Sequence, residues 1–139
     1  MNLDSVMTRN PKACIASATL EEVARVMRDE DVGEIPVVDQ QRRPIGVVTD
    51  RDIVVRTVAA GRDPLQTQAQ DCMTAPALVV SEHSTLEDCA HLMARQQVRR
   101  IPVVDAAGAL CGIVALADLE RTDARSLKAE VSSRVSSPH

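Results

Sequence analysis

The chain has 139 residues, of which 45 % are hydrophobic and 26 % are charged, a composition typical of a folded globular protein and not of a disordered one. The net charge of -4 argues against a nucleic-acid partner, because proteins that bind nucleic acid usually carry a basic face. No apolar run is long enough to span a bilayer and residues 1–4 lack the features of a signal peptide, so we expect a cytoplasmic protein with no membrane partner.

The side-chain inventory restricts the kinds of site that the chain could form. Phe, Tyr and Trp are absent, so an adenine ring would have to lie between aliphatic side chains and backbone. The four cysteines have neither a CxxC pair nor the spacing of a metal finger, and we expect reduced, mostly buried thiols. Cys89 and His91, with His83 nearby, are candidate metal ligands, but two residues apart on a helix they point in different directions. We therefore predict no metal site.

An internal repeat organises the chain. At an offset of 66, residues 19–52 align with residues 85–118 and are identical at 14 of 34 positions. Upstream, Met7-Thr8 recurs as Met73-Thr74. We predict a first repeat over residues 1–66, a second repeat over 67–120, and a partly disordered tail over 121–139.

Each repeat begins with a short extended piece, at residues 14–16 or 78–80, followed by a helix. A capping box predicts the start of each helix, formed by Thr19 with Glu22 and by Thr85 with Asp88. The helical spacing of apolar residues predicts the buried faces, which are Leu20, Val23, Ala24 and Met27 in the first copy and Leu86, Cys89, Ala90 and Met93 in the second.

A hairpin and a last helix complete each repeat. The apolar runs at residues 35–38 and 101–104 predict strands buried on both sides, and tight turns lead to second strands at 45–49 and 110–115. Because Pro36 and Pro102 cannot donate to a ladder, we expect each at the first residue of a strand or at a sheet edge. The last helix is predicted from Asp50 to about Ala60, closed by Gly61, and its second copy starts near Ala117. The fold class is α/β (α+β), with two strand-helix-strand-strand-helix repeats packed as one pseudo-two-fold module.

The junction between the second strand and the last helix carries the candidate chemistry. Thr49 and Arg51, together with the free amides of the helix start, are donors suited to a phosphate. Asp52 is an acceptor suited to the two hydroxyls of a ribose. Thr49 and Asp52 are also spaced as a helix capping box, so the pair has a purely structural alternative.

The repeated Ile-Pro-Val-Val-Asp, followed by Gly-Val-Val-Thr-x-x-Asp in the first copy, resembles the cystathionine-beta-synthase (CBS) domain. The two copies resemble the tandem pair called a Bateman module, over about residues 4–119. Residues 49–54 and 61–64 look like stand-alone bacterial pairs such as the hypoxic response protein group. The resemblance implies a non-catalytic regulatory module that binds AMP, ADP or ATP, or else NAD or S-adenosylmethionine, in clefts between the repeats, with no required cofactor.

The resemblance also implies the site residues. The ribose-binding aspartate falls on Asp52 and Asp118 and the hydroxyl on Thr49. The remaining expected contacts, with the base and with the phosphates, are Ala16, Ile35, Pro36, Val80, Ile101 and Pro102, and the cations Arg99 and Arg100. A disc-like homodimer is implied as well, using helix faces around Met27, Val54, Val58 and Met93.

The second copy departs from the family pattern. Ala115 replaces the hydroxyl and Ala117 replaces the cation, whereas the first copy has Gly33-Glu34 where the second has Arg99-Arg100. We therefore expect one good nucleotide site at Thr49, Arg51 and Asp52, reached by Arg99 or Arg100, and a weaker or empty site at Asp118. The alternative is a nucleotide-independent dimerisation or protein-interaction module. No His, Cys or Ser lies in a nucleophile motif, so we do not expect an enzyme.

Overall fold

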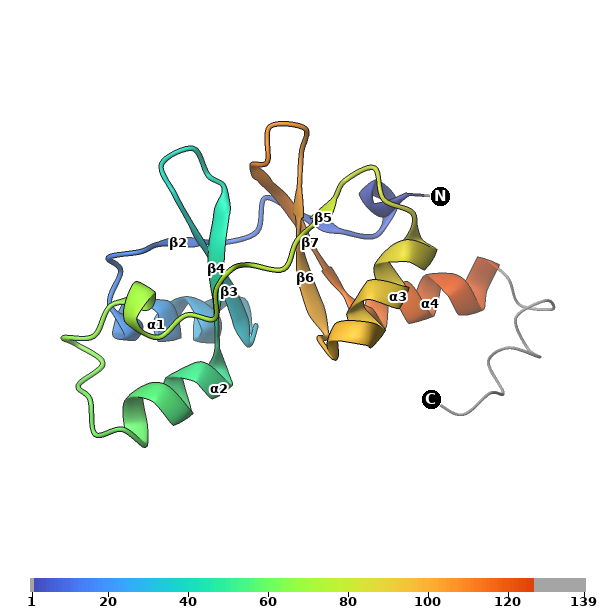
Figure 1. The fold of residues 1–139 in the computed structure, drawn as a ribbon. Helices are drawn as coiled ribbons and strands as arrows, with labels where there is room; N and C mark the ends of the chain where they lie inside the picture. The colour runs from blue at the N-terminus through green and yellow to red at the C-terminus, as the bar shows by residue number, and fades with distance from the viewer. Residues whose placement is uncertain (1, 127–139) are drawn as a thin grey trace.

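The computed structural model describes residues 2–126, and Figure 1 shows two sheets whose hairpins lie side by side with helices beside them. The three-stranded sheet has the order β2-β3-β4 and the four-stranded sheet the order β1-β7-β6-β5. Within residues 2–126, no helix has the length and apolar character needed to cross a membrane. The predicted α/β class and the two-repeat arrangement are confirmed.

The elements of the first half are the 3-10 turn η1 (Leu3–Ser5), β1 (Thr8–Arg9), β2 (Cys14–Ile15), α1 (Leu20–Glu30), β3 (Glu34–Val38), β4 (Pro44–Thr49), α2 (Asp50–Ile53) and the π-helical turn η2 (Val54–Val58). The second half contains the 3-10 turn η3 (Ala69–Asp71), β5 (Val80–Ser81), α3 (Leu86–Gln96), β6 (Arg100–Val104), β7 (Leu110–Ala115) and α4 (Leu116–Ser126). The strand-helix-strand-strand-helix order predicted for both copies is therefore observed, and the part of the predicted tail after residue 126 lies outside the described residues.

The local signals in the two copies work in the same way. Thr19 accepts a hydrogen bond from the Glu22 amide at 3.2 Å and Thr85 accepts one from the Asp88 amide at 3.0 Å, so each hydroxyl caps its helix as predicted. The predicted capping boxes are only half formed in the described residues, because the Glu22 and Asp88 carboxylates do not bond back to the cap amides. The side chain of Asp39 accepts from two backbone amides of the β3–β4 turn, and Asp105 does the same in the β6–β7 turn. Ala24 was predicted to lie on the buried face of α1, and this prediction is wrong because Ala24 is exposed.

The positions predicted for Pro36 and Pro102, at the first residue of a strand or at a sheet edge, are wrong. Each is the third residue of its strand, β3 or β6, and neither strand lies at the edge of its sheet. The neighbouring parallel strand, however, reaches only the two residues that follow each proline, Val37 and Val38 or Val103 and Val104. Each proline therefore lies beyond the end of that neighbour, where no ladder hydrogen bond is lost.

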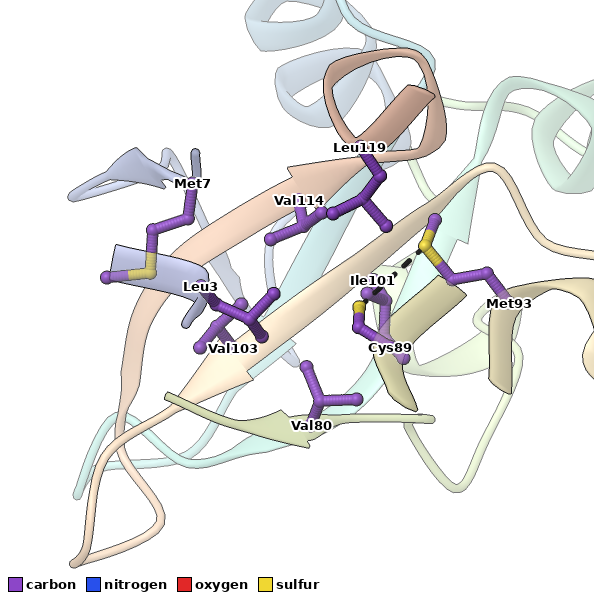
Figure 2. Close-up of a cluster of buried hydrophobic side chains, with 9 residues drawn as sticks. All are labelled: Leu3, Met7, Val80, Cys89, Met93, Ile101, Val103, Val114 and Leu119. Carbon is purple, nitrogen blue, oxygen red and sulfur yellow. Dashed lines mark hydrogen bonds between the residues drawn. The ribbon is translucent and has the colours of Figure 1, made fainter. Parts of the chain in front are cut away.

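The segment ahead of each repeat crosses to the sheet of the other repeat. In the first segment, β1 pairs with β7, with Thr8 opposite Ile113, and 66 residues later Thr74 bridges Val47 of β4. Leu3 and Met7 consequently belong to the core of the second half (Figure 2), and Ala69 and Cys72 belong to the core of the first. The division of the chain at residue 66 stays a prediction about sequence units, because in space each half holds a piece of the other.

The helix face expected for dimerisation is partly wrong. Met27 and Met93 are buried in the two cores and present no surface to a second chain. Val54 and Val58 are 57 % and 64 % exposed. Of the four expected residues, the two that face outward therefore both lie on η2.

Candidate functional site

The Thr49–Asp52 pair forms the capping box that begins α2. The Asp52 amide donates to Thr49 Oγ1 at 3.0 Å, and the Thr49 amide donates to Asp52 Oδ2, also at 3.0 Å. The β4 strand delivers Thr49 to this position, and the box satisfies two backbone amides that a helix start leaves free. The structural alternative for this pair is therefore confirmed.

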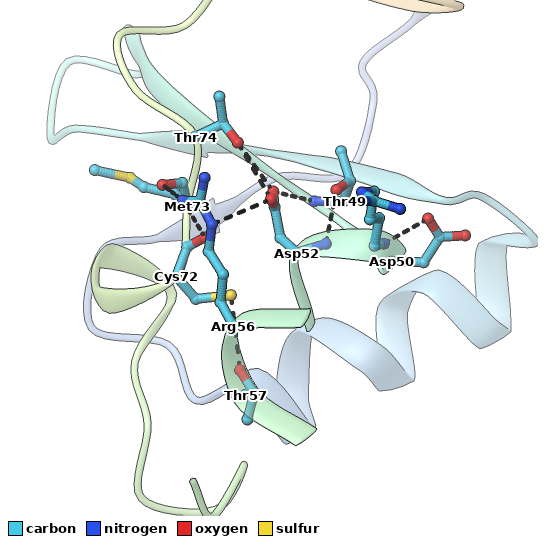
Figure 3. Close-up of polar contacts among 9 residues, drawn as sticks. Thr49, Asp50, Asp52, Arg56, Thr57, Cys72, Met73 and Thr74 are labelled. Atoms are coloured by element: carbon cyan, nitrogen blue, oxygen red, sulfur yellow. Dashed lines mark hydrogen bonds and ion pairs between the residues drawn. The ribbon is translucent and has the colours of Figure 1, made fainter. Parts of the chain in front are cut away.

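The Asp52 carboxylate has further protein partners, which Figure 3 shows. The Thr74 hydroxyl lies 3.2 Å from both carboxylate oxygens, and Arg56 Nε lies 3.8 Å from Oδ1. The Arg56 guanidinium also donates to the carbonyl oxygens of Cys72 and Met73. Asp52 is only 8 % exposed, so its carboxylate is buried beneath these donors.

Thr74 and Arg56 are partners that the sequence reasoning missed. The signal for Thr74 was present in the recurrence of Met-Thr at residues 7–8 and 73–74. The bridge between Thr74 and Val47 brings this dipeptide beside α2. Arg56 follows Asp52 by one helical turn, a spacing that allows an ion pair.

A cleft of about 220 Å³ lies at the seam between the halves. Its apolar side chains, Val32, Ile35 and Ile113, come from both halves, and its charged side chains are Lys12, Glu30, Glu34 and Arg100, with Thr8 and Pro11 completing the lining. Of the predicted site residues, Ile35 and Arg100 line this cleft. Thr49, Arg51, Asp52 and Asp118 do not line it.

Two opposite charges share the cleft without pairing. Within residues 2–126, no ion pair within 4.0 Å joins Glu34 to Arg100, and neither side chain has a hydrogen-bond partner. Burial raises the pKa of Glu34 to about 7, with Arg100 acting to lower it and Asp52 acting to raise it further. The cleft therefore holds a cation free to meet an anion and a carboxyl group that titrates near neutral pH.

The other predicted site residues are spread over both halves. Arg51 and Arg99 are exposed, Ala16 is half-buried, and Val80, Pro36, Ile101 and Pro102 are buried. The Asp118 carboxylate is half-buried and pairs with Arg121. The structure thus brings together Ile35 and Arg100 at the seam, and Thr49 and Asp52 at the start of α2.

The cysteines are free thiols, two buried and two half-buried. Burial raises the pKa of Cys89 to about 11, and burial together with the nearby Glu22 raises that of Cys14 to about 11. Both thiols are therefore protonated at neutral pH. Among residues 2–126 there is no group of three or more His, Cys, Asp or Glu side chains placed to hold a metal ion.

Comparison with known sequences finds the same family for both halves of the chain. The model of the CBS domain matches residues 3–57 and 69–124. The CBS domain-containing protein YhcV of Bacillus subtilis is 41 % identical over 118 residues, which are 85 % of this chain and 82 % of YhcV. The protein MK0525 of Methanopyrus kandleri is 36 % identical over 101 residues, and the matched part spans 73 % of this chain but about half, 52 %, of MK0525.

Solved structures share the fold. A crystal structure of Hypoxic Response Protein I with two coordinated zinc ions has a TM-score of 0.81 and 31 % identity, covering 87 % of this chain and 98 % of that one; the hypoxic response protein 1 sequences that match are from Mycobacterium tuberculosis. CBSX2 of Arabidopsis thaliana, crystallised in complex with AMP, has a TM-score of 0.76 and 27 % identity, covering 89 % and 96 %. With both repeats matched by the family and the same pair fold in these structures, the chain belongs to the CBS domain family.

Proposed function

We propose that the chain is a non-catalytic regulatory module of the cytoplasm that binds an adenosine mononucleotide at the seam between its two CBS repeats. The observation that carries this proposal is the seam cleft, where aliphatic side chains from both halves stand beside the unpaired cation of Arg100. The relationship to CBSX2, which was crystallised with AMP, supports the choice of ligand class.

The lining of the cleft suits the parts of such a ligand. Without aromatic residues, a base must pack on aliphatic groups, and Val32, Ile35 and Ile113 provide them. Arg100 and Lys12 provide charge for a phosphate, and the guanidinium provides paired donors that fit phosphate oxygens. The volume of about 220 Å³ is below the usual range of about 300 to 1,000 Å³ for pockets that enclose drug-sized ligands. This size favours a mononucleotide, with its phosphate at the mouth, over a dinucleotide such as NAD.

Asp52 keeps its proposed role toward a ribose alongside its role as a cap. Its carboxylate accepts the Thr74 hydroxyl at 3.2 Å, so a ribose hydroxyl that reached this carboxylate would replace one hydroxyl donor with another. The hydrogen bond to the Thr49 amide would be unaffected by that exchange. In this proposal, Asp118 serves a second, weaker site, because Ala115 and Ala117 stand where the first copy has the hydroxyl of Thr49 and the cation of Arg51.

The test is calorimetric titration of the purified protein with AMP, ADP, ATP, NAD and S-adenosylmethionine, comparing wild type with Arg100→Gln. Loss of a hydrogen-bonded charge costs about 1.5 to 3 kcal/mol, so AMP affinity should fall about tenfold to a hundredfold. Arg99→Gln is the matched control, because Arg99 is the adjacent arginine and lies outside the cleft lining. Equal AMP affinities in wild type and both variants would show that the seam cleft is not the nucleotide site. If none of the five ligands bound, the result would favour an interaction module.

We also propose self-association into a homodimer, supported by the exposed apolar surface of Val54, Val55 and Val58 on η2. Regulation by a CBS module requires that ligand occupancy alter a contact with another protein surface, and this surface is a candidate for such a contact.

A further inference from the structure

The seam cleft brings together two positions that the duplication makes equivalent. Glu34 is the first residue of β3 and Arg100 is the first residue of β6, and 100 − 34 gives the same offset of 66 that relates the repeats. Both side chains line the same cleft of about 220 Å³. A perfect duplication would place two like charges here, whereas this chain places an acid opposite a base.

The surroundings of Glu34 favour its neutral form. Asp52 and Glu30 add negative charge from α2 and from the end of α1, and Asp50 lies beside Gly33, the residue before Glu34. Arg100 from β6 and Lys12 from the segment ahead of β2 oppose them. Burial without a hydrogen-bond donor is the largest of the effects that disfavour the ionised carboxylate, and the net result is a pKa raised to about 7.

A phosphate drawn into the cleft by Arg100 would lie close to Glu34. An ionised carboxylate repels a phosphate and attracts the same guanidinium, so it opposes binding twice. A protonated carboxyl removes the repulsion and offers an O–H donor to a phosphate oxygen. Arg100 stays charged throughout this range, so the protonation state of Glu34 decides how strongly the cation is available.

We propose that nucleotide binding at the seam is coupled to the uptake of a proton by Glu34, which makes this residue a pH-dependent determinant of affinity. The proposal rests on the proposed nucleotide function and adds its regulation. As pH rises through about 7, Glu34 ionises in the free protein and affinity falls; below that pH, Glu34 is already protonated and affinity reaches a plateau.

The experiment is calorimetric titration with AMP at pH 6, 7 and 8 in wild type, Glu34→Gln and Glu30→Gln. If only the protonated form binds, a pKa of about 7 makes wild-type affinity about tenfold weaker at pH 8 than at pH 6. Glu34→Gln keeps the shape of the side chain and should lose this decrease. Glu30→Gln removes the other acid of the cleft lining and should still show the decrease in affinity between pH 6 and pH 8. The titration of AMP itself is common to all three proteins, so the readout is the difference between them.

A second readout is the number of protons taken up, measured from binding heats at pH 7 in two buffers of different ionisation enthalpy. Wild type should take up about half a proton more per AMP than Glu34→Gln. AMP binding at pH 6 with the same pH dependence in wild type and Glu34→Gln would overturn the coupling and leave the nucleotide function intact. Loss of the pH dependence in Glu30→Gln but not in Glu34→Gln would show that Glu30 takes up the proton, which would overturn the role of Glu34. Absence of AMP binding at every pH would overturn both proposals.

Discussion

Asp52 has a structural role that is independent of the ligand role proposed for it. It caps α2 through the Thr49 amide and receives the Thr74 hydroxyl from the segment that precedes the second repeat. Because the side chain is almost fully buried, each of these donors would be left without an acceptor if the carboxylate were removed. A loss of ligand binding in an Asp52 variant is therefore informative only when its stability is also measured.

We predict that Asp52→Ala lowers the free energy of unfolding by about 1.5 to 3 kcal/mol, the range for hydrogen bonds to a charged group. Asp118→Ala is the control, because the Asp118–Arg121 pair is largely exposed on its Arg121 side and should contribute about 0 to 1 kcal/mol. Urea denaturation followed by far-ultraviolet circular dichroism suits a chain without Trp or Tyr. Equal stability losses in the two variants would show that the α2 cap is not the dominant role of Asp52.

At the scale of the element, the helix after β4 differs from its prediction in an instructive way. An unbroken helix was expected from Asp50 to about Ala60, but four α-helical residues are followed by the π-helical turn η2, where the Ala59 amide donates to the Val54 carbonyl. Thr57 turns inward and contacts Cys72, and Val54, Val55 and Val58 turn outward. Apolar spacing could not predict this, because a wider turn changes which residues share a face.

We predict that the outward valines hold a homodimer together. The double substitution Val54→Lys with Val58→Lys places charge on side chains that are more than half exposed in the monomer, so the fold should persist and association should be lost. Ile15→Lys is the control, as an equally exposed apolar residue on β2. Light scattering after size-exclusion chromatography reports the mass. A monomeric wild type, or a dimer in the double variant, would contradict the assignment.

At the scale of the whole molecule, local signals were predictable and long-range partners were not. Short motifs are enough to predict contacts between a side chain and a backbone amide a few residues away. The caps at Thr19 and Thr85 and the turns at Asp39 and Asp105 are contacts of this kind. The pairing of β1 with β7 joins segments about 100 residues apart and leaves no local pattern. The cleft at Glu34 and Arg100 depends on the same long-range packing, and the sequence named Arg100 but missed Glu34, Lys12 and Thr8 as its lining.

The crossing of the leading segments makes each half depend on the other, and Leu3 is the sharpest place to test this. Leu3 is fully buried among Val103, Val114 and other core residues of the second half, although it is one of the first residues of the chain (Figure 2). Leu3→Ala should therefore cost about 2 to 5 kcal/mol and reduce hydrogen-exchange protection of the β6 amides. Leu65→Ala, at an exposed leucine, should change little. If Leu3→Ala weakened only residues near the N-terminus and left β6 protected, the halves would be independent, and a cleft built from both could not transmit ligand binding from one to the other.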